Sequence, residues 1–404
     1  MDEVATQYEA YPYPERDPAE EARRLITGSP SDPQEIDHLL FRGRRDWRQP
    51  FRALVAGGGT GDGLIMLAQK LADARCPAEI VYLDLSEAAR KVAEARATAR
   101  GLTSIRFETG DVLSAPDFGP FDYIDCCGVL HHLPDPGAGF RALAAALAPE
   151  GGIGLMVYAP YGRTGVYPLQ AALRTLTADD TPGAKVRLAR TVLEGLPESN
   201  WFTRNPYLSD HRASDAGLYD LLLHARDTPF DVAALIAALR EAGLDLVSFA
   251  EPARYDPMRY LPASDAVTDR LKTLSAEERF ALAEQLAGDI RVHVAYAAPG
   301  SRAGKTIAKP DAEAVPRLRD LPANALATQV ARRGHLSIDF RGAKQTVEIP
   351  ASAAPLIGAI DGRPLGAMAK AQGLDWFAFA AAWAPVHKAL TGFNLLRYSR
   401  QLSR

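Results

Sequence analysis

The sequence is poor in cysteine, with only Cys76, Cys126 and Cys127 among 404 residues. So few cysteines exclude a disulfide scaffold, and an adjacent pair is a poor geometry for zinc, so no metal site is predicted. The sequence also lacks any apolar run approaching the roughly 18–20 residues that span a bilayer. Its first residues, MDEVATQYEA, hold no apolar signal core. We therefore expect a cytoplasmic protein that is not exported and has no membrane partner.

No charge of one sign dominates, because 46 Lys and Arg face 50 Asp and Glu. The composition, 47% hydrophobic and 24% charged, excludes a mainly disordered chain. The charges are unevenly spread, since residues 1–300 carry a net charge of −12 and residues 301–404 carry +8. Length and asymmetry favour two or three domains with a boundary near residue 300. The asymmetry reflects either different partners or a plain difference in surface charge.

Apolar strands alternate with amphipathic helices over about 110 residues after residue 50. This alternation is typical of a doubly wound α/β domain with a parallel sheet. The predicted strands occupy residues 51–59, 79–86, 105–112, 121–130, 153–160 and 291–300, and the helices between them occupy 61–74, 87–101 and 140–152.

The other segments differ in composition, which suggests further domain boundaries. Residues 1–50 are rich in proline, arginine and aromatics and are interpreted as an N-terminal preamble or lid. Within a domain of residues 51–299, the helical and aromatic segment at about 160–230 is interpreted as a cap inserted over the sheet. The Pro- and charge-rich residues 300–322 are predicted to be a linker. Residues 323–404 combine a hairpin pattern with short helices, which favours a small α+β, winged-helix-like domain.

A glycine-rich turn, VAGGGTGDG, closes the first strand and opens the first helix. Glycines at 57, 59 and 61 permit a sharp turn and a close approach of backbone to ligand. Asp84 ends the second strand, where a carboxylate can accept hydrogen bonds from both hydroxyls of a ribose. Asp111 ends the third strand, within reach of an adenine amino group. Carboxyl ends of parallel strands are where open α/β sheets bind ligands, so these groups predict a nucleoside site.

Together with the motif CGVLHHLPDP after the fourth strand, this pattern resembles the class I S-adenosylmethionine-dependent methyltransferases over roughly residues 50–160. The resemblance implies a seven-stranded Rossmann-like sheet. It also implies S-adenosylmethionine as cofactor and S-adenosylhomocysteine as product. The glycine loop would pass under the methionine part, while Asp84 would hold ribose and Asp111 would face adenine. The cofactor-binding residues so implied are Gly57, Gly58, Gly59, Gly61, Asp84, Leu85, Asp111, Val112, Cys127, Gly128 and Tyr11.

One position departs from the family pattern. The acidic residue usually found ahead of the glycine loop is Val55 here, which removes a contact often made to the cofactor's amino group. Asp62, within the loop, is a candidate replacement. Two alternatives follow from the loop: a dinucleotide site, although GTGDG lacks the later glycine of G-x-G-x-x-G, and a non-catalytic cofactor-binding scaffold or sensor.

His131 and His132 are the candidate catalytic residues. Methyl transfer needs the acceptor in line with the methyl group and often a group that takes the acceptor's proton. A histidine suits that task because it titrates near neutrality. The alternative is a structural or orienting role for both histidines.

Aromatic residues on two segments are expected to surround the acceptor. Tyr8, Tyr11 and Tyr13 belong to an opening, QYEAYPYP, that resembles a bacterial methyltransferase group and suggests a lid over the cofactor. Aromatic and polar residues of the 160–230 segment make a plausible acceptor pocket, with core packing as the alternative for each of them. The predicted substrate-pocket residues are Tyr158, Tyr161, Arg163, Tyr167 and His224.

The C-terminal segment weakly resembles small winged-helix regions appended to bacterial protein- and peptide-modifying enzymes. The matching motifs are IDGRPLGAM and GFNLL, and the hairpin turn is predicted at RGAK. The resemblance implies docking of a polypeptide, so the first-choice acceptor is a protein or peptide side chain, with a small metabolite as the alternative. Nucleic acid is not the expected partner, because the segment lacks a dense basic cluster interleaved with aromatics. The sequence does not indicate an oligomeric state.

Overall fold

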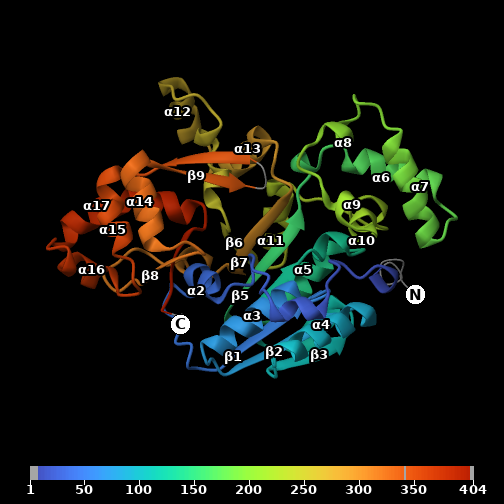
Figure 1. Ribbon diagram of the computed structural model, residues 1–404, viewed down its shortest axis with the longest axis horizontal. Helices are drawn as coiled ribbons and strands as arrows, with labels where there is room; N and C mark the ends of the chain where they lie inside the picture. The colour runs from blue at the N-terminus through green and yellow to red at the C-terminus, as the bar shows by residue number, and fades with distance from the viewer. Residues whose placement is uncertain (1–7, 341–342, 401–404) are drawn as a thin grey trace.

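A seven-stranded sheet forms the centre of the computed structural model, which describes residues 8–340 and 343–400 (Figure 1). Its strand order is β3-β2-β1-β4-β5-β7-β6, and only β7 runs antiparallel to its neighbours. The predicted doubly wound, Rossmann-like methyltransferase sheet is therefore confirmed. The strands are β1 (Phe51–Ala56), β2 (Ala78–Asp84), β3 (Ile105–Thr109), β4 (Phe121–Cys127), β5 (Leu147–Tyr158), β6 (Leu244–Phe249) and β7 (Val292–Pro299).

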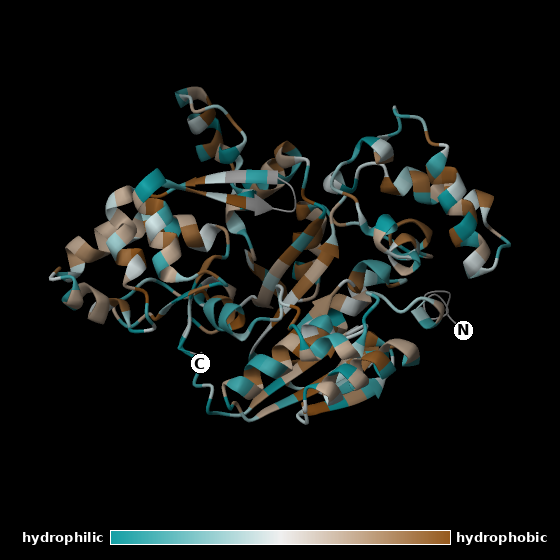
Figure 2. Cartoon of the chain, viewed as in Figure 1, coloured by the Kyte–Doolittle hydropathy of each residue, from teal (hydrophilic) through white to brown (hydrophobic). Residues whose placement is uncertain are grey.

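Helices cover both faces of the sheet, which explains why its strands are almost continuously apolar (Figure 2). One face packs against α2 (Pro33–Leu40), α3 (Asp62–Asp73) and α4 (Glu87–Ala99). The other packs against α5 (Pro136–Ala145), α11 (Val232–Glu241) and α13 (Ala276–Ala287). Side-chain caps at Ser86 for α4 and Asp135 for α5 fix where these helices begin. No helix among residues 8–340 and 343–400 is long and apolar enough to cross a membrane.

One predicted boundary is wrong. The helix predicted over residues 140–152, with a Pro-Glu-Gly-Gly stop at 149–152, ends at Ala145, and β5 already begins at Leu147. Leu147 pairs with Phe121 of β4, so a partner distant in sequence converts this stretch into strand. Helix propensity is a weak prior that such tertiary pairing overrides.

The segment between β5 and α11 folds as a small helical layer with its own core. Leu173, Phe202 and Leu218 are buried in that core. In Figure 1 this layer lies beside the carboxyl end of the sheet, as expected of a cap. The layer consists of η4 (Tyr161–Arg163), α6 (Val166–Leu176), α7 (Pro182–Glu194), α8 (Trp201–Arg204), α9 (Asp210–Ala213), α10 (Asp215–Leu218) and η5 (Tyr219–Leu223).

The C-terminal region is a second compact unit built around Met368, Phe379 and Trp383. The predicted hairpin is present as β9 and β10, although its predicted turn at Arg341 and Gly342 lies outside the described residues. The similarity to winged-helix domains stays a prediction. The elements are α14 (Ala323–Arg333), β9 (His335–Phe340), β10 (Ala343–Glu348), α15 (Ala354–Gly358), α16 (Leu365–Ala371), α17 (Trp376–Gly392) and β11 (Leu396–Tyr398).

Residues 300–322, predicted to be a linker, are tied into both parts of the molecule. They contain β8 (Pro316–Leu318), which pairs antiparallel with β11. Arg42 N donates to Thr306 O at 2.7 Å, and Ala308 N donates to His38 O at 2.7 Å. The partner strand lies about 80 residues further along the chain, so the local sequence gives no sign of this pairing.

A buried ion cluster joins the N-terminal segment to the C-terminal strand. Arg397 of β11 binds the carboxylates of Asp32 and Glu35, and Lys70 Nζ lies 2.8 Å from Asp32 Oδ2. Burial alone raises the pKa of Asp32, but the facing Arg397 and Lys70 outweigh it and lower this pKa to about 2. The cluster therefore fixes α2, and with it the residues preceding the sheet, against the C-terminal region.

Replacing Arg397 by leucine is expected to lower the free energy of unfolding by about 3 kcal/mol, because Asp32 and Glu35 both lose this cation and Asp32 keeps only Lys70. Urea titration measures this change. Arg400→Leu is the matched control, since Arg400 pairs with Glu313 at the surface, 3.8 Å away, and such pairs contribute about 1 kcal/mol or less. Equal losses for the two variants would contradict the assignment.

Candidate functional site

A cavity of about 460 Å³ lies at the carboxyl ends of β1, β2, β4 and β5. It extends from the end of β2 across the glycine loop to the residues after β4. The predicted site residues that line it are Gly57, Gly58, Gly59, Asp84, Leu85, Asp111, Cys127, Gly128, His132 and Tyr158. Pro14 of the QYEAYPYP motif and Asp220 of the cap segment also line it. Leu113, Asp125 and Met156 line it as well, but they lie outside the motifs found in the sequence, so only spatial proximity identifies them.

Two glycines of the loop are required by their surroundings. Gly57 has a φ of +66°, and a Cβ there would lie 2.2 Å from Cγ2 of Val129. Gly59 has a φ of +51°, and a Cβ there would lie 3.0 Å from the carbonyl oxygen of Tyr13. Any side chain at these positions is strained and collides with its neighbours. Gly61 begins α3 and does not line the cavity.

Asp84 is held at the cavity wall by two backbone amides. Gly59 N donates to Oδ2 and Ser86 N donates to Oδ1, each at 2.8 Å. Burial raises the pKa of Asp84 even though these two hydrogen bonds lower it. A carboxylate oxygen accepts more than one hydrogen bond, so each oxygen retains capacity for a ligand hydroxyl.

After β3, Asp111 and Leu113 line the cavity, whereas Val112 between them packs in the core. The Asp111 carboxylate accepts a hydrogen bond from Leu113 N at 2.8 Å, which caps η2 (Val112–Asp117). Asp111 and Leu113 line the cavity, and Leu113 is 45% exposed. Val112 instead points into the core and does not line the cavity.

The N-terminal segment forms part of the cavity wall. Tyr8 and Tyr13 line it, whereas Tyr11 stacks on Tyr219 of the cap at 5.2 Å and is not among the lining residues. The segment is anchored by Arg16, whose Nε lies 2.8 Å from Oδ1 of Asp62. Tyr8 and Tyr13 thus contribute to the cavity wall, as residues of a lid would. The sequence did not distinguish these two tyrosines from Tyr11.

Asp62 does not have a free carboxylate. Arg16 binds both of its oxygens, and Arg96 Nη1 lies 2.8 Å from Oδ1. Burial raises the pKa of Asp62, but the two arginines outweigh it and lower that pKa. Because its charge is already compensated, Asp62 is a poor replacement for the acid missing at Val55.

Buried polar groups gather at the other end of the cavity, where the cap meets the sheet. Tyr158 OH donates to Asp220 Oδ2 at 2.8 Å, and Tyr8 OH donates to Asp220 Oδ1 at 3.3 Å. Tyr8 OH also lies 3.2 Å from His224 Nε2, and the rings of His224 and His132 stack at 3.6 Å. The cluster brings together residues from the N-terminus, β5, the post-β4 motif and the cap.

The hydrogen bonds of this cluster define the imidazole tautomers. His132 Nδ1 lies 2.6 Å from the carbonyl oxygen of Arg226, so it carries the proton and leaves Nε2 with a lone pair. Within the described part of the chain, that Nε2 is buried and has no partner. Arg226 N donates to His224 Nδ1 at 3.1 Å, so Nε2 of His224 carries the proton and donates to Tyr8.

Three of these side chains have ligand atoms within 4.8 Å of one another, namely His132, Asp220 and His224. A metal would need an unprotonated nitrogen from each histidine. The proton on His224 Nε2 disfavours metal binding by that nitrogen. The same proton is used in the hydrogen bond to Tyr8 OH. The cluster is therefore better suited to handling a proton than to holding a metal.

Several predicted residues surround the cluster without lining the cavity. His131 is fully buried, and burial lowers its pKa well below the usual range. Arg163 stacks over the ring of Tyr158 at 3.7 Å, and its Nε donates to Tyr167 OH at 3.1 Å. Tyr161 is 36% exposed. The five predicted catalytic and substrate-pocket residues that do not line the cavity are His131, Arg163, Tyr161, Tyr167 and His224.

Comparisons with known proteins agree with this geometry. Residues 54–153 match the methyltransferase domain family. An uncharacterized protein of Synechococcus sp. is 32% identical over 249 residues, which cover 59% of this chain and 58% of that protein. The ubiquinone biosynthesis O-methyltransferase of Xanthomonas axonopodis pv. citri is 33% identical over 124 residues, 30% of this chain and 50% of the enzyme. The chain thus spans little more than half the length of these curated relatives.

A solved structure, PKMT2 from Rickettsia typhi, shares the fold with a TM-score of 0.64 at 13% identity. The match covers 93% of this chain and 76% of that one, so it includes the C-terminal region. The same protein in complex with AdoHcy matches with a TM-score of 0.61. The fold, the glycine loop and the matched family together define a class I S-adenosylmethionine-dependent methyltransferase domain. S-adenosylmethionine is accordingly the cofactor of this domain.

Proposed function

We propose that the protein transfers a methyl group from S-adenosylmethionine to an acceptor at the cap end of the 460 Å³ cavity. The observation that carries this proposal is the continuity of one cavity from Asp84 to His132. Asp84 would accept hydrogen bonds from the ribose, and the glycine loop would support the methionine part. When bound, the cofactor supplies an electrophilic methyl group on its sulfonium.

His132 is proposed to take the proton of the acceptor on Nε2. Its Nδ1–H bond to Arg226 O fixes the ring and keeps that lone pair available. Asp220 would stabilise the imidazolium that forms, as a buried carboxylate near a cation does. Tyr8 and Tyr158 hold Asp220 in place and exclude water from the site. His131 has no corresponding route to the cavity, so the proposal keeps one of the two predicted catalytic histidines.

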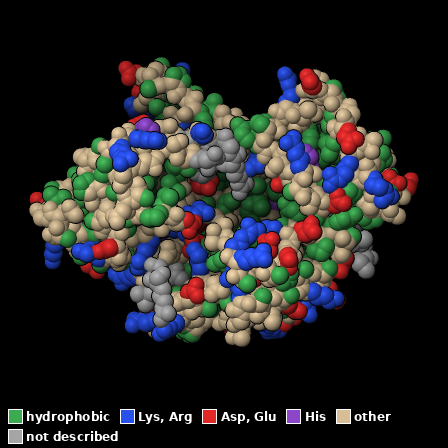
Figure 3. All heavy atoms as spheres, viewed as in Figure 1, with side chains coloured by type: hydrophobic (Ala, Val, Ile, Leu, Met, Phe, Trp, Pro, Cys, Tyr) green, Lys and Arg blue, Asp and Glu red, His purple; other side chains and the backbone are tan. Residues whose placement is uncertain are grey.

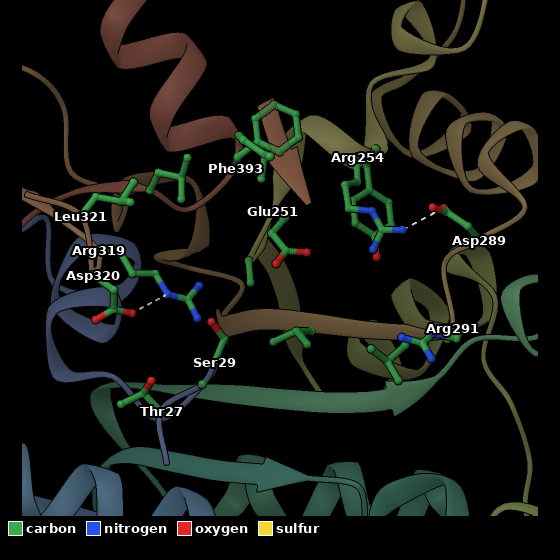
Figure 4. A pocket seen from close by; sticks show the side chains of 17 residues that line it. Thr27, Ser29, Glu251, Arg254, Asp289, Arg291, Arg319, Asp320, Leu321 and Phe393 are labelled. Carbon is green, nitrogen blue, oxygen red and sulfur yellow. Dashed lines mark hydrogen bonds and ion pairs between the residues drawn. The ribbon is translucent and has the colours of Figure 1, made fainter. Parts of the chain in front are cut away.

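The proposed acceptor is a side chain of a protein or peptide. A second cavity of about 490 Å³ supports this, because it lies between the sheet and the C-terminal region (Figure 4). Met156 of the first cavity pairs with Val294 of the second, and Tyr158 pairs with Val292. Directly paired side chains lie on one face of a sheet, so Met156 and Tyr158 of the first cavity lie beside Val294 and Val292 of the second, on strands about 5 Å apart.

The second cavity presents charges of both signs, which suits a polypeptide better than an apolar metabolite. Figure 4 shows Arg254 paired with Asp289, and Arg319 near Asp320, around an opening bordered by Phe393. The surface in Figure 3 is hollowed in the middle of this face, between the C-terminal region and the cap. Lys and Arg are scattered over the C-terminal region of that face rather than gathered in one patch.

A small metabolite is the second candidate acceptor. It is favoured by the relatives named as ubiquinone biosynthesis O-methyltransferases, the first of which matches 30% of this chain. A metabolite acceptor gives the C-terminal region no role in recognition.

A transfer assay with methyl-labelled S-adenosylmethionine in cell extract distinguishes the two acceptors. We expect label in a discrete protein band, and we expect Phe393→Glu to reduce that labelling at least tenfold by obstructing the second cavity. Affinity for S-adenosylhomocysteine should be unchanged in this variant, because Phe393 does not line the first cavity. Label only in small molecules, insensitive to Phe393→Glu, would favour the metabolite.

A further inference from the structure

Asp125 is a buried carboxylate that the proposed methyl transfer does not yet use. It lies on β4, is 1% exposed and lines the first cavity. Ser31 Oγ donates a hydrogen bond to its Oδ2. A buried carboxylate is costly unless a cation or several hydrogen bonds compensate it, so its position facing a ligand cavity requires an explanation.

The register of the sheet connects Asp125 to the departure at Val55. Val55 of β1 pairs directly with Asp125 of β4, and both line the cavity. Adjacent strands lie about 4.8 Å apart, so the carboxylate is displaced sideways by one strand from the position where an acid was expected. The apolar Val55 thus occupies the expected position of the acid on β1, and the acid Asp125 lies beside it on β4.

Gly63 at the start of α3 keeps a side chain away from Asp125, since a Cβ there would lie 3.3 Å from Asp125 Oδ2 and 2.6 Å from Ser31 Oγ. Burial raises the pKa of Asp125 to about 6, the Ser31 hydrogen bond opposes this rise and nearby Glu35 adds to it. The shift is that of a carboxylate without a compensating cation, and a bound ammonium group would supply one.

Five other acids line the cavity, and each has another partner or place. Asp62 is neutralised by Arg16 and Arg96, and Asp220 accepts hydrogen bonds from Tyr8 and Tyr158. Asp84 lies at the end of β2, two strands away from β4, while Asp111 and Asp135 cap η2 and α5. Asp125 is left on the side of the cavity formed by the glycine loop and β4, where the methionine part of the cofactor would lie.

We propose that Asp125 binds the α-ammonium group of the cofactor's methionine part and replaces the acid absent at Val55. The inference rests on the proposed function, since it assumes that the first cavity holds S-adenosylmethionine. It assigns recognition of the amino-acid portion to β4, while Asp84 recognises the nucleoside.

Calorimetry with two probes tests this division. S-adenosylhomocysteine carries the ammonium group, whereas 5′-methylthioadenosine carries the nucleoside and sulfur without it. Asp125→Asn is expected to weaken S-adenosylhomocysteine about 10- to 100-fold, the effect of losing one charge-assisted hydrogen bond. Affinity for 5′-methylthioadenosine should stay within about twofold. Equal affinity of the variant and the wild type for S-adenosylhomocysteine would overturn the inference, as would an equal loss for both probes.

Rescue by exchange of the two residues is the sharper test. Val55→Asp combined with Asp125→Val returns the acid to β1 and should recover most of the lost affinity for S-adenosylhomocysteine. Ser31→Ala, which removes the structural hydrogen bond but keeps the carboxylate, should bind both probes like the wild type. Failure of the exchange together with loss of affinity in Ser31→Ala would assign Asp125 a structural role instead.

Wild-type protein provides a readout that does not depend on any variant folding. Deaminated S-adenosylhomocysteine should bind at least tenfold more weakly than S-adenosylhomocysteine itself. Equal binding of these two compounds overturns the inference while leaving the proposed function intact. If the wild type binds none of the probes, the proposed function fails and the inference fails with it.

Discussion

Replacing His132 by glutamine is expected to lower kcat by about 10²- to 10⁴-fold, the usual contribution of a positioned general base. The reason is the lone pair on Nε2, which Nδ1 leaves unprotonated by donating to Arg226 O at 2.6 Å, and His132 lines the cavity. Glutamine preserves the size and polarity of the side chain but cannot take the proton. Single-turnover transfer of labelled methyl to the acceptor measures the effect, separated from cofactor binding.

His131→Gln is the matched control for that prediction. His131 is adjacent in sequence and equally buried, yet it does not line the cavity. We expect its variant to retain kcat within about tenfold and to change mainly the midpoint of thermal unfolding. If His131→Gln lost as much kcat as His132→Gln, the two rings would act as one structural unit, and the assignment of His132 as base would be wrong.

Asp84→Ala is expected to weaken S-adenosylhomocysteine by at least about 10²-fold, because the carboxylate would lose hydrogen bonds from two ribose hydroxyls. The same carboxylate anchors the loop through Gly59 N, so its removal also releases the turn beneath the cofactor. Isothermal titration calorimetry gives the affinity directly. Unlike Asp125→Asn, this variant should lose 5′-methylthioadenosine to a comparable degree.

Asp111→Ala serves as the comparison for Asp84. Its carboxylate lies at the exposed rim, where it caps η2 through Leu113 N. We expect a loss of affinity of about tenfold or less, since groups at a solvated rim contribute little. A larger effect at Asp111 than at Asp84 would contradict the proposed orientation of the nucleoside along the ends of β2 and β3.

The central sheet was predictable because its signals are local. The strands β1, β2 and β4 are short, mainly apolar runs, β3 is a shorter mixed one, and all four were predicted within a few residues. The extension of β5 back to Leu147 and the pairing of β8 with β11 were not predictable. Both depend on a partner strand distant along the chain, and hydrophobic periodicity carries no information on such partners.

The candidate site divides in the same way. Gly57, Gly59 and Asp84 were identified from the sequence because their signals are local. A glycine-rich turn and the end of an apolar strand can both be recognised in a few consecutive residues. His132 could not be separated from His131 by sequence, since the distinction is a hydrogen bond to Arg226, 94 residues away. Of the predicted substrate-pocket residues, Tyr158 lines the cavity, whereas Tyr161, Arg163, Tyr167 and His224 do not.

By itself, the sequence determined that this protein has a nucleoside-binding α/β domain with an acidic catalytic part and a basic C-terminal part. The tertiary structure decided which acid faces the cavity, because the register of β1 against β4 places Asp125 beside Val55. The tertiary structure also pairs the Asp62 carboxylate with Arg16 and Arg96. A carboxylate's function depends on which charges and amides surround it, and those neighbours are brought together only by the folding of distant segments.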